Sequence, residues 1–204
     1  MTRDEFLAAL TTSLRDLTAW LTERNIPHAI VGGVAVAIVG RPRITDDIDA
    51  VVLAEHTDPK DLLADAIAHG FAPRRPDAAE FARESRVLQL KHAADGILVD
   101  VALGILPFER EMIDRAKYAP VGGVQIPVAT PEDLIVMKIL AYRGKDVADI
   151  ESILDANAKV DLRRVRYWAQ MMSAGLESPE IIERLNELLS RRGPSRRKKK
   201  KRKT

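Results

Sequence analysis

Two aspartates one residue apart in an apolar segment constrain this chain more than any other feature. Residues 47–53 predict a buried-type strand in which Asp47 and Asp49 point to the same face, roughly 6.6–6.8 Å apart along the strand. Two carboxylates that close repel each other and resist ionising together. A divalent cation removes this conflict, and Mg²⁺ prefers carboxylates combined with substrate phosphates. The pair predicts metal-assisted chemistry on a phosphate; the alternative is an ordinary acidic pair on an edge strand.

A third aspartate, Asp100, lies in the middle of the apolar segment 97–103, which predicts another strand. Burial of a carboxylate there is costly unless it is paired or bound to a metal. If the two strands are neighbours, three carboxylates converge, which is enough for two Mg²⁺ ions roughly 3.5–4 Å apart, the clamp used in phosphoryl and nucleotidyl transfer. Each acid taken alone is more often a cap, a turn or a surface residue.

Gly32 and Gly33 follow a short apolar strand at residues 28–31 and precede residues 34–39. The β-branched residues of this last segment favour a strand and its alanines permit a helix; we take it as a helix. Glycine then allows close backbone approach, and the N–H groups at a helix start bind phosphate. The alternative is a tight strand-to-helix turn without a ligand.

Arg41 and Arg43 flank Pro42 just before the acids. Their guanidinium groups could hold triphosphate oxygens bidentately, or they could form a basic loop that balances nearby carboxylates. Thr45 opens the motif Thr45-Asp46-Asp47-Ile48-Asp49, and we include it among the nucleotide-binding candidates.

Lys138 is the one charged residue in the run 134–142, which predicts a helix that is apolar all round and therefore buried. A buried lysine needs a partner, either a carboxylate of the metal site or a nucleotide phosphate. The alternative is a buried stem whose ammonium reaches water. Arg143, Asp146 and Asp149 follow on the next turn and helix, where Asp146 is favoured by the helix dipole.

The order of the predicted elements indicates an α+β fold, with a small mixed sheet and helices followed by a C-terminal helical bundle. Strands are predicted at 28–31, 47–53, 86–91, 97–103 and 125–128, with 94–96 as a hairpin turn. Helices are predicted at 4–24, 34–39, 60–69, 107–117, 131–143, 145–157, 162–174 and 179–190. We expect a core at 1–128, a helical region at 129–190 that packs on it, and a disordered Lys/Arg tail at 191–204.

The net charge of +2 conceals an uneven distribution. Of the 32 Lys and Arg residues, ten lie in 191–204, which leaves 22 against 30 acids, a charge of −8, in residues 1–190. Such a tail either contacts nucleic-acid phosphates or is solvated without a partner. The chain has no cysteine, no apolar run of transmembrane length and no signal-peptide pattern, so we expect a cytoplasmic protein without disulfides or membrane association.

Three blocks together resemble the nucleotidyltransferases of the DNA polymerase β superfamily and, more closely, the AbiEii-type toxin family. They are residues 30–49, which hold the double glycine and the acidic motif, residues 99–101, and residues 130–150. The resemblance spans roughly residues 28–155 and leaves out the basic tail. Many superfamily members place serine where this chain has Gly33, although a double glycine looks usual for the toxin-like branch.

The resemblance implies a role for each matching residue. Asp47 and Asp49 would bind both metals, and Asp100 would bind the catalytic metal and assist deprotonation of the attacking group. Gly32 and Gly33 would hold the triphosphate and Lys138 would contact phosphate. Arg143, Asp146 and Asp149 would support the site.

The predicted function is transfer of a nucleoside monophosphate from an NTP to an acceptor, with two Mg²⁺ ions and release of pyrophosphate. The acceptor could be a tRNA 3′ end, a protein hydroxyl or a small molecule. The AbiEii resemblance and the tail favour RNA, with toxin-like activity and an antitoxin as partner. The alternatives are an aminoglycoside-type nucleotidyltransferase and a catalytically silent nucleic-acid-binding or interaction protein of the same fold.

Overall fold

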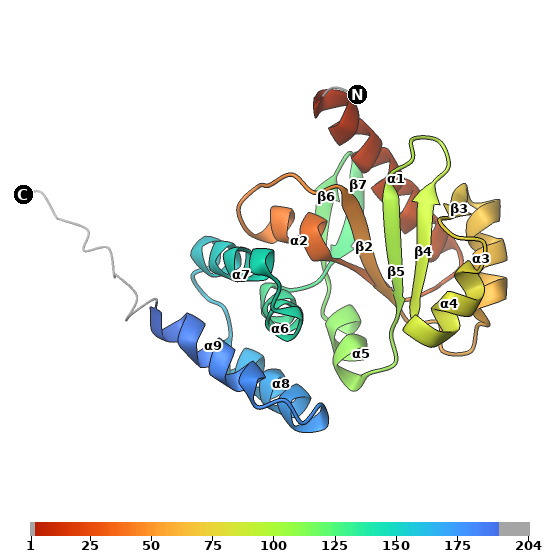
Figure 1. Ribbon diagram of the computed structural model, residues 1–204. Helices are drawn as coiled ribbons and strands as arrows, with labels where there is room; N and C mark the ends of the chain where they lie inside the picture. The colour runs from red at the N-terminus through yellow and green to blue at the C-terminus, as the bar shows by residue number, and fades with distance from the viewer. Residues whose placement is uncertain (1–2, 192–204) are drawn as a thin grey trace, which may run out of the picture.

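The computed structural model describes residues 3–191 and shows a mixed sheet with helices around it and a helical extension (Figure 1). The helices are α1 (Arg3–Glu23), α2 (Gly32–Val39), α3 (Pro59–Ala68), α4 (Ala78–Ser85), α5 (Pro107–Asp114), α6 (Pro131–Ala141), α7 (Gly144–Ala156), α8 (Leu162–Gly175) and α9 (Glu180–Arg191). The strands are β1 (His28–Val31), β2 (Asp47–Val52), β3 (Phe71–Pro73), β4 (Val87–His92), β5 (Leu98–Leu103), β6 (Lys117–Val121) and β7 (Val124–Val128). The predicted disorder of the basic tail falls on residues 192–204, outside the described residues; Arg191 still belongs to α9.

The seven described strands form one sheet in the order β3-β4-β5-β2-β1-β7-β6. β2 is parallel to β5 and β1 is parallel to β7, whereas the other neighbours are antiparallel. This arrangement confirms the predicted α+β class with a mixed sheet. It also makes β2 and β5 direct neighbours, which is the pairing that the acidic residues required.

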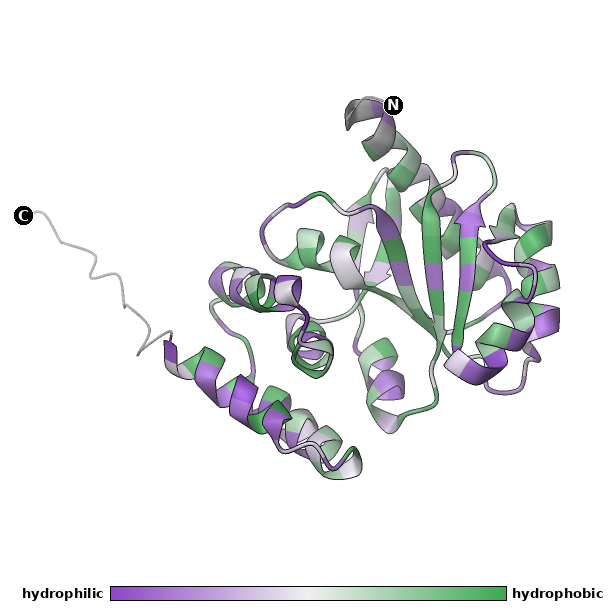
Figure 2. Ribbon diagram, viewed as in Figure 1, coloured by the Kyte–Doolittle hydropathy of each residue, from purple (hydrophilic) through white to green (hydrophobic). Residues whose placement is uncertain are grey.

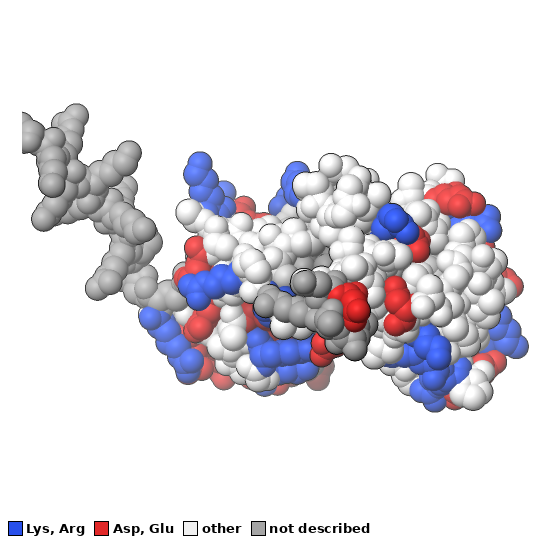
Figure 3. All heavy atoms as spheres, turned by 90° about the horizontal axis from the view of Figure 1, so that it is seen from above, with Lys and Arg blue, Asp and Glu red and all other residues white. Residues whose placement is uncertain are grey.

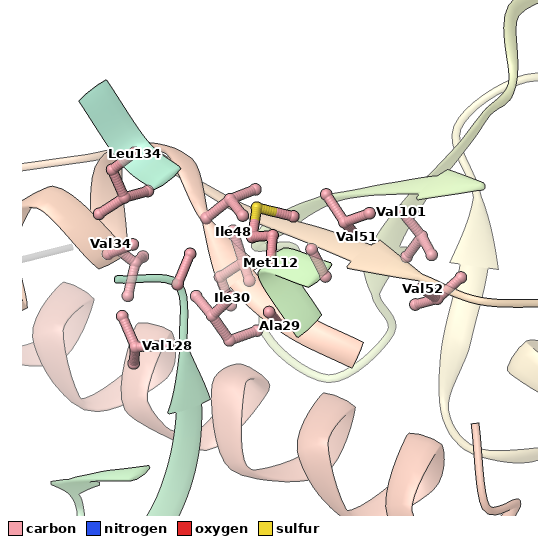
Figure 4. Packing of buried hydrophobic residues seen from close by; sticks show 14 of the residues in the cluster. Ala29, Ile30, Val34, Ile48, Val51, Val52, Val101, Met112, Val128 and Leu134 are labelled. Atoms are coloured by element: carbon pink, nitrogen blue, oxygen red, sulfur yellow. The ribbon is translucent and has the colours of Figure 1, made fainter. Parts of the chain in front are cut away.

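The central strands bury one face and leave the other partly open. Along β2, β5 and β4 the buried Ile48, Val99 and Leu88 alternate with more exposed neighbours, as expected for strands of period two. In Figure 1 α1 passes behind these strands, and its buried Leu17 and Trp20 belong to the same hydrophobic core. Figure 4 shows aliphatic side chains of β1, β2 and β5 in this core. β5 has one charged residue among apolar ones, visible as a hydrophilic band in Figure 2.

Several elements differ from the prediction. β3 and α4 were not predicted, because a three-residue strand and a short polar helix give little periodic signal. The helix predicted to reach Lys117 ends at Asp114, since Lys117 begins β6. β6 contains Pro120 and is an edge strand, where proline is tolerated. Gly122 and Gly123, both with positive φ, form its hairpin with β7, a two-glycine signal that could have been read from the sequence.

The helical extension begins as predicted. The Thr130 side chain accepts a hydrogen bond from the backbone N–H of Asp133, and Pro131 takes the first helical position of α6. α6 packs against α2, α7, α8 and α9, so it connects the extension to the sheet side of the molecule. None of the helices in residues 3–191 combines the length and the apolar composition needed to span a lipid bilayer.

Candidate active site

The three predicted acids lie on one face of the sheet. Asp49 of β2 is paired in register with Asp100 of β5, and Asp47 lies two residues before Asp49 on the same face. On the other side of β2, Asp49 is opposite Val31, the last residue of β1. Residues that are far apart in the sequence therefore meet on the half-buried side of three adjacent strands.

The double glycine lies directly against Asp49. Gly32 has φ +62°, and a Cβ atom on it would lie 1.7 Å from Asp49 Oδ2, so this position accepts no other residue without rearrangement. The backbone N–H of Gly33 donates a hydrogen bond to Asp49. The helix expected after the pair is confirmed as α2, and it already begins at Gly32. The positive end of α2 thus faces the acids.

The carboxylates are short of positive charge. Burial raises the pKa of Asp49, and the carboxylates of Asp47 and Asp100 raise it further, against a hydrogen bond from Gly33 and the charge of Lys138. Burial also raises the pKa of Asp100; Arg74 opposes this shift and Asp47 adds to it. Both acids therefore bind protons more tightly than a free aspartate, because their ionised forms are insufficiently compensated.

A cavity of about 230 Å³ opens beside Asp49 and Asp100. Its lining includes Gly32 on the sheet side and, across from it, the apolar Met137 of α6. Lys138 and Arg143 also line it, so it combines apolar walls with both acidic and basic groups. A concave site with a few convergent polar groups is the usual form of a ligand pocket.

Lys138 is buried, with 5% of its side chain exposed, and its partners are carboxylates of α7. Its Nζ lies 3.0 Å from Asp146 Oδ1 and 2.8 Å from Asp149 Oδ2. The alternative in which its ammonium reaches water is therefore wrong. Burial works against the ionised form of Asp146, but hydrogen bonds from Arg143 and Lys138 outweigh it, so that the pKa of Asp146 is lowered. Arg143 Nε donates to Asp146 Oδ2 at 3.0 Å.

The two arginines of the preceding loop take different partners. Arg43 binds Asp149 with two contacts, Nε to Oδ1 at 2.9 Å and Nη2 to Oδ2 at 3.1 Å. Arg41 instead pairs with Asp155, at 2.6 Å, and 71% of its side chain is exposed. Asp155 lies nine residues beyond Asp146 on α7, which is roughly 13–14 Å along a helix. Arg43 therefore belongs to the network that Lys138 forms with Asp146 and Asp149, whereas Arg41 lies apart from this network.

Thr45 occupies the space that a side chain at position 33 would need. A Cβ atom on Gly33 would lie 2.2 Å from Thr45 Oγ1, and this hydroxyl donates to Asp47 Oδ1 at 3.0 Å. A serine at position 33 would clash with it. The threonine hydroxyl beside the acids therefore accounts physically for the glycine at this position.

No sequence motif singles out Arg74, which the structure places on Asp100 with 2.5 Å between Nη2 and Oδ1. Arg74 follows β3 directly, and its N–H donates to the carbonyl of Gln89 on β4. Gln89 is in turn paired in register with Asp100. This contact depends on the pairing of a three-residue strand, so no local sequence signal could have revealed it.

The donor set suits Mg²⁺, although the acids are engaged with other partners. In the described part of the chain, no three His, Cys, Asp or Glu side chains form a group ready to hold a metal ion. Thr45 binds Asp47 and Arg74 binds Asp100. Three carboxylates on one face nevertheless provide the hard oxygen ligands that Mg²⁺ prefers, and a cation there would relieve the repulsion that raises the pKa of Asp49.

The family described as "Nucleotidyltransferase of unknown function (DUF6036)" matches residues 6–186. Among solved structures, the antibiotic-resistance factor ANT(2″)-Ia in solution is similar, with 17% identity, a TM-score of 0.58, and coverage of 86% of this chain and 97% of that chain. An antigenic nucleotidyltransferase-like protein from Paracoccidioides brasiliensis is 16% identical, with a TM-score of 0.52 and coverage of 91% and 94%. These likenesses show the fold. No protein of curated function matches the sequence.

Proposed function

The chain belongs to the DUF6036 family of nucleotidyltransferases, and from this membership and the acidic site we propose a Mg²⁺-dependent enzyme that transfers a nucleoside monophosphate from an NTP to an acceptor. The observation that carries the proposal is the register of Asp49 with Asp100, beside Gly32 and the cavity. In this proposal Asp47, Asp49 and Asp100 hold the metal. Bound Mg²⁺ would stabilise negative charge on the attacking and leaving oxygens.

The acceptor oxygen forms a bond to the α-phosphorus, and the bond from that phosphorus to the β-phosphate bridging oxygen breaks. Pyrophosphate leaves with the electron pair of the broken bond. The proton of an acceptor hydroxyl passes to Asp100.

The triphosphate would lie between the double glycine and two cations, Lys138 of α6 and Arg143 at the start of α7. Lys138 and Arg143 line the cavity, and their charges attract phosphate oxygens. Asp146 and Asp149 fix Lys138 in place, so they position a phosphate-binding group without contacting the nucleotide. Arg43, held by Asp149, adds a third cation at the edge of this network.

We further propose RNA as the acceptor, with a toxin-like role and an antitoxin as partner. The support is the AbiEii resemblance together with the Lys/Arg tail. Nine of the 32 Lys and Arg residues lie in 192–204, which leaves 23 against 30 acids in residues 3–191, a charge of −7. Apart from the atoms drawn grey, the face in Figure 3 carries interspersed acidic and basic side chains and no continuous basic surface. Long-range attraction of RNA to this face would therefore depend on the tail.

A small-molecule acceptor is the second candidate. It is favoured by the similarity to ANT(2″)-Ia, which is named as an antibiotic-resistance factor and of which this chain covers 97%. Deletion of residues 191–204 separates the two acceptors, because only RNA modification should fall steeply without the tail.

The decisive experiment incubates the protein with each labelled NTP, Mg²⁺ and total RNA, beside Asp49→Ala and the matched variant Asp46→Asn. Asp46 is exposed, so its substitution tests loss of an acid in the same motif outside the cavity lining. Label in RNA that disappears with Asp49→Ala and persists with Asp46→Asn supports the proposal. Label in the protein itself indicates self-modification. Absence of label from every fraction with every nucleotide would favour a catalytically silent module over an RNA-modifying enzyme.

A further inference from the structure

We propose that Arg74 is a displaceable partner of Asp100, which releases this carboxylate to the metal and then binds a phosphate of the acceptor. The inference rests on the proposed function and names the class of acceptor, one that carries a phosphate next to its attacking hydroxyl. It starts from the contact between Arg74 Nη2 and Asp100 Oδ1, which engages one of the three predicted metal ligands.

Arg74 reaches Asp100 across an intervening strand. Its backbone pairs with Gln89 of β4, and Gln89 pairs with Asp100 of β5. Adjacent strands are roughly 4.8 Å apart, so the arginine side chain extends over β4 along the open face of the sheet. Asp49, Asp100 and Gln89 thus form a polar row across β2, β5 and β4, and Arg74, directly after β3, continues it.

The contact is exposed enough to be exchanged. The side chains of Arg74 and Asp100 are 21% and 30% exposed, whereas those of Lys138 and Asp146 are 5% and 0% exposed. Partly solvated ion pairs contribute little, because water competes for both charges. A divalent cation that binds Asp100 both competes with the guanidinium and repels it, so metal binding and the Arg74 contact oppose each other.

Arg74 lies on the side of the acids that faces away from the proposed triphosphate site. Lys138 belongs to α6, which packs against α2, the helix that follows β1, whereas Arg74 comes from the β3 edge of the sheet. On this edge, β3 (71–73) and β4 (87–92) contain no acidic residue, and the exposed Lys91 shares the face of Gln89. Arginine presents paired donors that match phosphate oxygens. Arg74 and Lys91 therefore supply the positive charge that a phosphate-bearing acceptor needs at these two strands.

The neighbouring arginine provides a matched control. Arg75 is bound by Asp77 at 2.6 Å and its guanidinium lies 4.1 Å from the centre of the Phe81 ring. It carries the same charge one position along the chain and makes no contact with the acids of the sheet that the structure shows. Arg74→Ala and Arg75→Ala therefore separate the specific contact from a general loss of positive charge.

The release of Asp100 is tested by Mn²⁺ binding to the full-length protein, followed by the electron paramagnetic resonance signal of the free ion without nucleotide. We expect Arg74→Ala to bind Mn²⁺ about threefold to fivefold more tightly than the wild type, since a weak competing ion pair is lost. Arg75→Ala should match the wild type. Equal or weaker Mn²⁺ binding by Arg74→Ala would overturn the proposal, and it does so whether or not the protein transfers nucleotides.

The acceptor contact is tested with a fluorescein-labelled RNA tetranucleotide, Mg²⁺ and an NTP analogue whose α–β bridge does not cleave. We expect Arg74→Ala to weaken tetranucleotide binding by about tenfold or more, since hydrogen bonds between charged groups are strong. Arg74→Lys should recover part of the affinity, and the affinity for the analogue should not fall in either variant. Unchanged tetranucleotide binding in Arg74→Ala, an equal loss in Arg75→Ala, or no binding by the wild type would each refute the acceptor assignment. A protein that meets both expectations but transfers no nucleotide would refute the proposed activity alone.

Discussion

The protein contains two groups of buried or half-buried aspartates, and the pKa shifts in the two groups have opposite directions. On the sheet, Asp47, Asp49 and Asp100 crowd together, and the pKa of Asp49 is raised by burial and by its acidic neighbours. On α7, Asp146 and Asp149 are more deeply buried, yet hydrogen bonds from Arg143 and Lys138 lower the pKa of Asp146. The difference is the supply of cations. The α7 group is complete in itself, whereas the sheet group lacks positive charge, which is the signature of a site that takes its cation from solution.

The largest effect is expected from Asp49→Asn, which removes a charge from the incomplete group. Transfer should fall on the order of a thousandfold, because charge stabilisation at the reacting phosphate is lost. The metal-free fold should gain on the order of 1 kcal/mol, because a strained acid becomes neutral. Labelled nucleotide transfer and urea unfolding without Mg²⁺ measure the two effects. A variant that loses both activity and stability would mean that Asp49 is structural, as we expect of the α7 acids.

Asp146→Asn should destabilise the fold, whereas Asp49→Asn should stabilise it. The change leaves Lys138 with a single carboxylate partner in a buried place, which should cost about 3 kcal/mol in the free energy of unfolding. Thermal unfolding followed by circular dichroism measures this loss. Glu187→Gln is the control, since Glu187 and its partner Arg191 are both largely exposed and loss of this pair should cost well under about 1 kcal/mol. Equal losses in the two variants would remove the distinction between a complete buried network and surface pairs.

The sequence predicted the sheet group better than the α7 group. Two acids at alternate strand positions and a third in another apolar strand define a face, and β2–β5 pairing alone was needed to unite them. For Lys138 the sequence predicts a carboxylate of the metal site or a phosphate as partner. The carboxylates that it contacts belong to α7 instead, because they depend on how α6 and α7 pack. Arg74 was missed because it depends on β3, whose three residues give no periodicity. The acidic face of a strand could thus be predicted from the local sequence pattern. Contacts between separate elements could not, because they depend on how those elements pack.

The two groups meet at Gly33, whose substitution should have a smaller effect. A Cβ atom there would lie 2.2 Å from Thr45 Oγ1 and 3.1 Å from Arg43 Nη2, the side chains that bind Asp47 and Asp149 respectively. Gly33→Ser should cost about 2 kcal/mol in the free energy of unfolding through overpacking.

A double-mutant cycle with Thr45→Ala tests the cause of that cost. Removal of the threonine hydroxyl should recover at least half of the loss in Gly33→Ser, because the two side chains compete for one place. Chemical unfolding of the four proteins gives the coupling energy. Additive losses would show that the clash with Thr45 is not what excludes serine, and that the two groups are not linked through this position.

The smallest effect, about 1 kcal/mol or less, is the pH dependence of stability, in which the two groups should differ in sign. Asp49 has a raised pKa in the fold, so its favourable contribution is present below the ordinary aspartate value of about 4 and is lost as the pH rises through the folded value. Asp146 has a lowered pKa, so its contribution is present above about 4 and is lost as the pH falls. The advantage of Asp49→Asn over the wild type should therefore grow above about pH 4 and shrink when Mg²⁺ is added. The advantage of the wild type over Asp146→Asn should shrink as the pH falls below that value. Urea unfolding across the pH range measures both differences, and curves that run parallel for the two variants would mean that both groups are compensated alike, with no unfilled charge on the sheet.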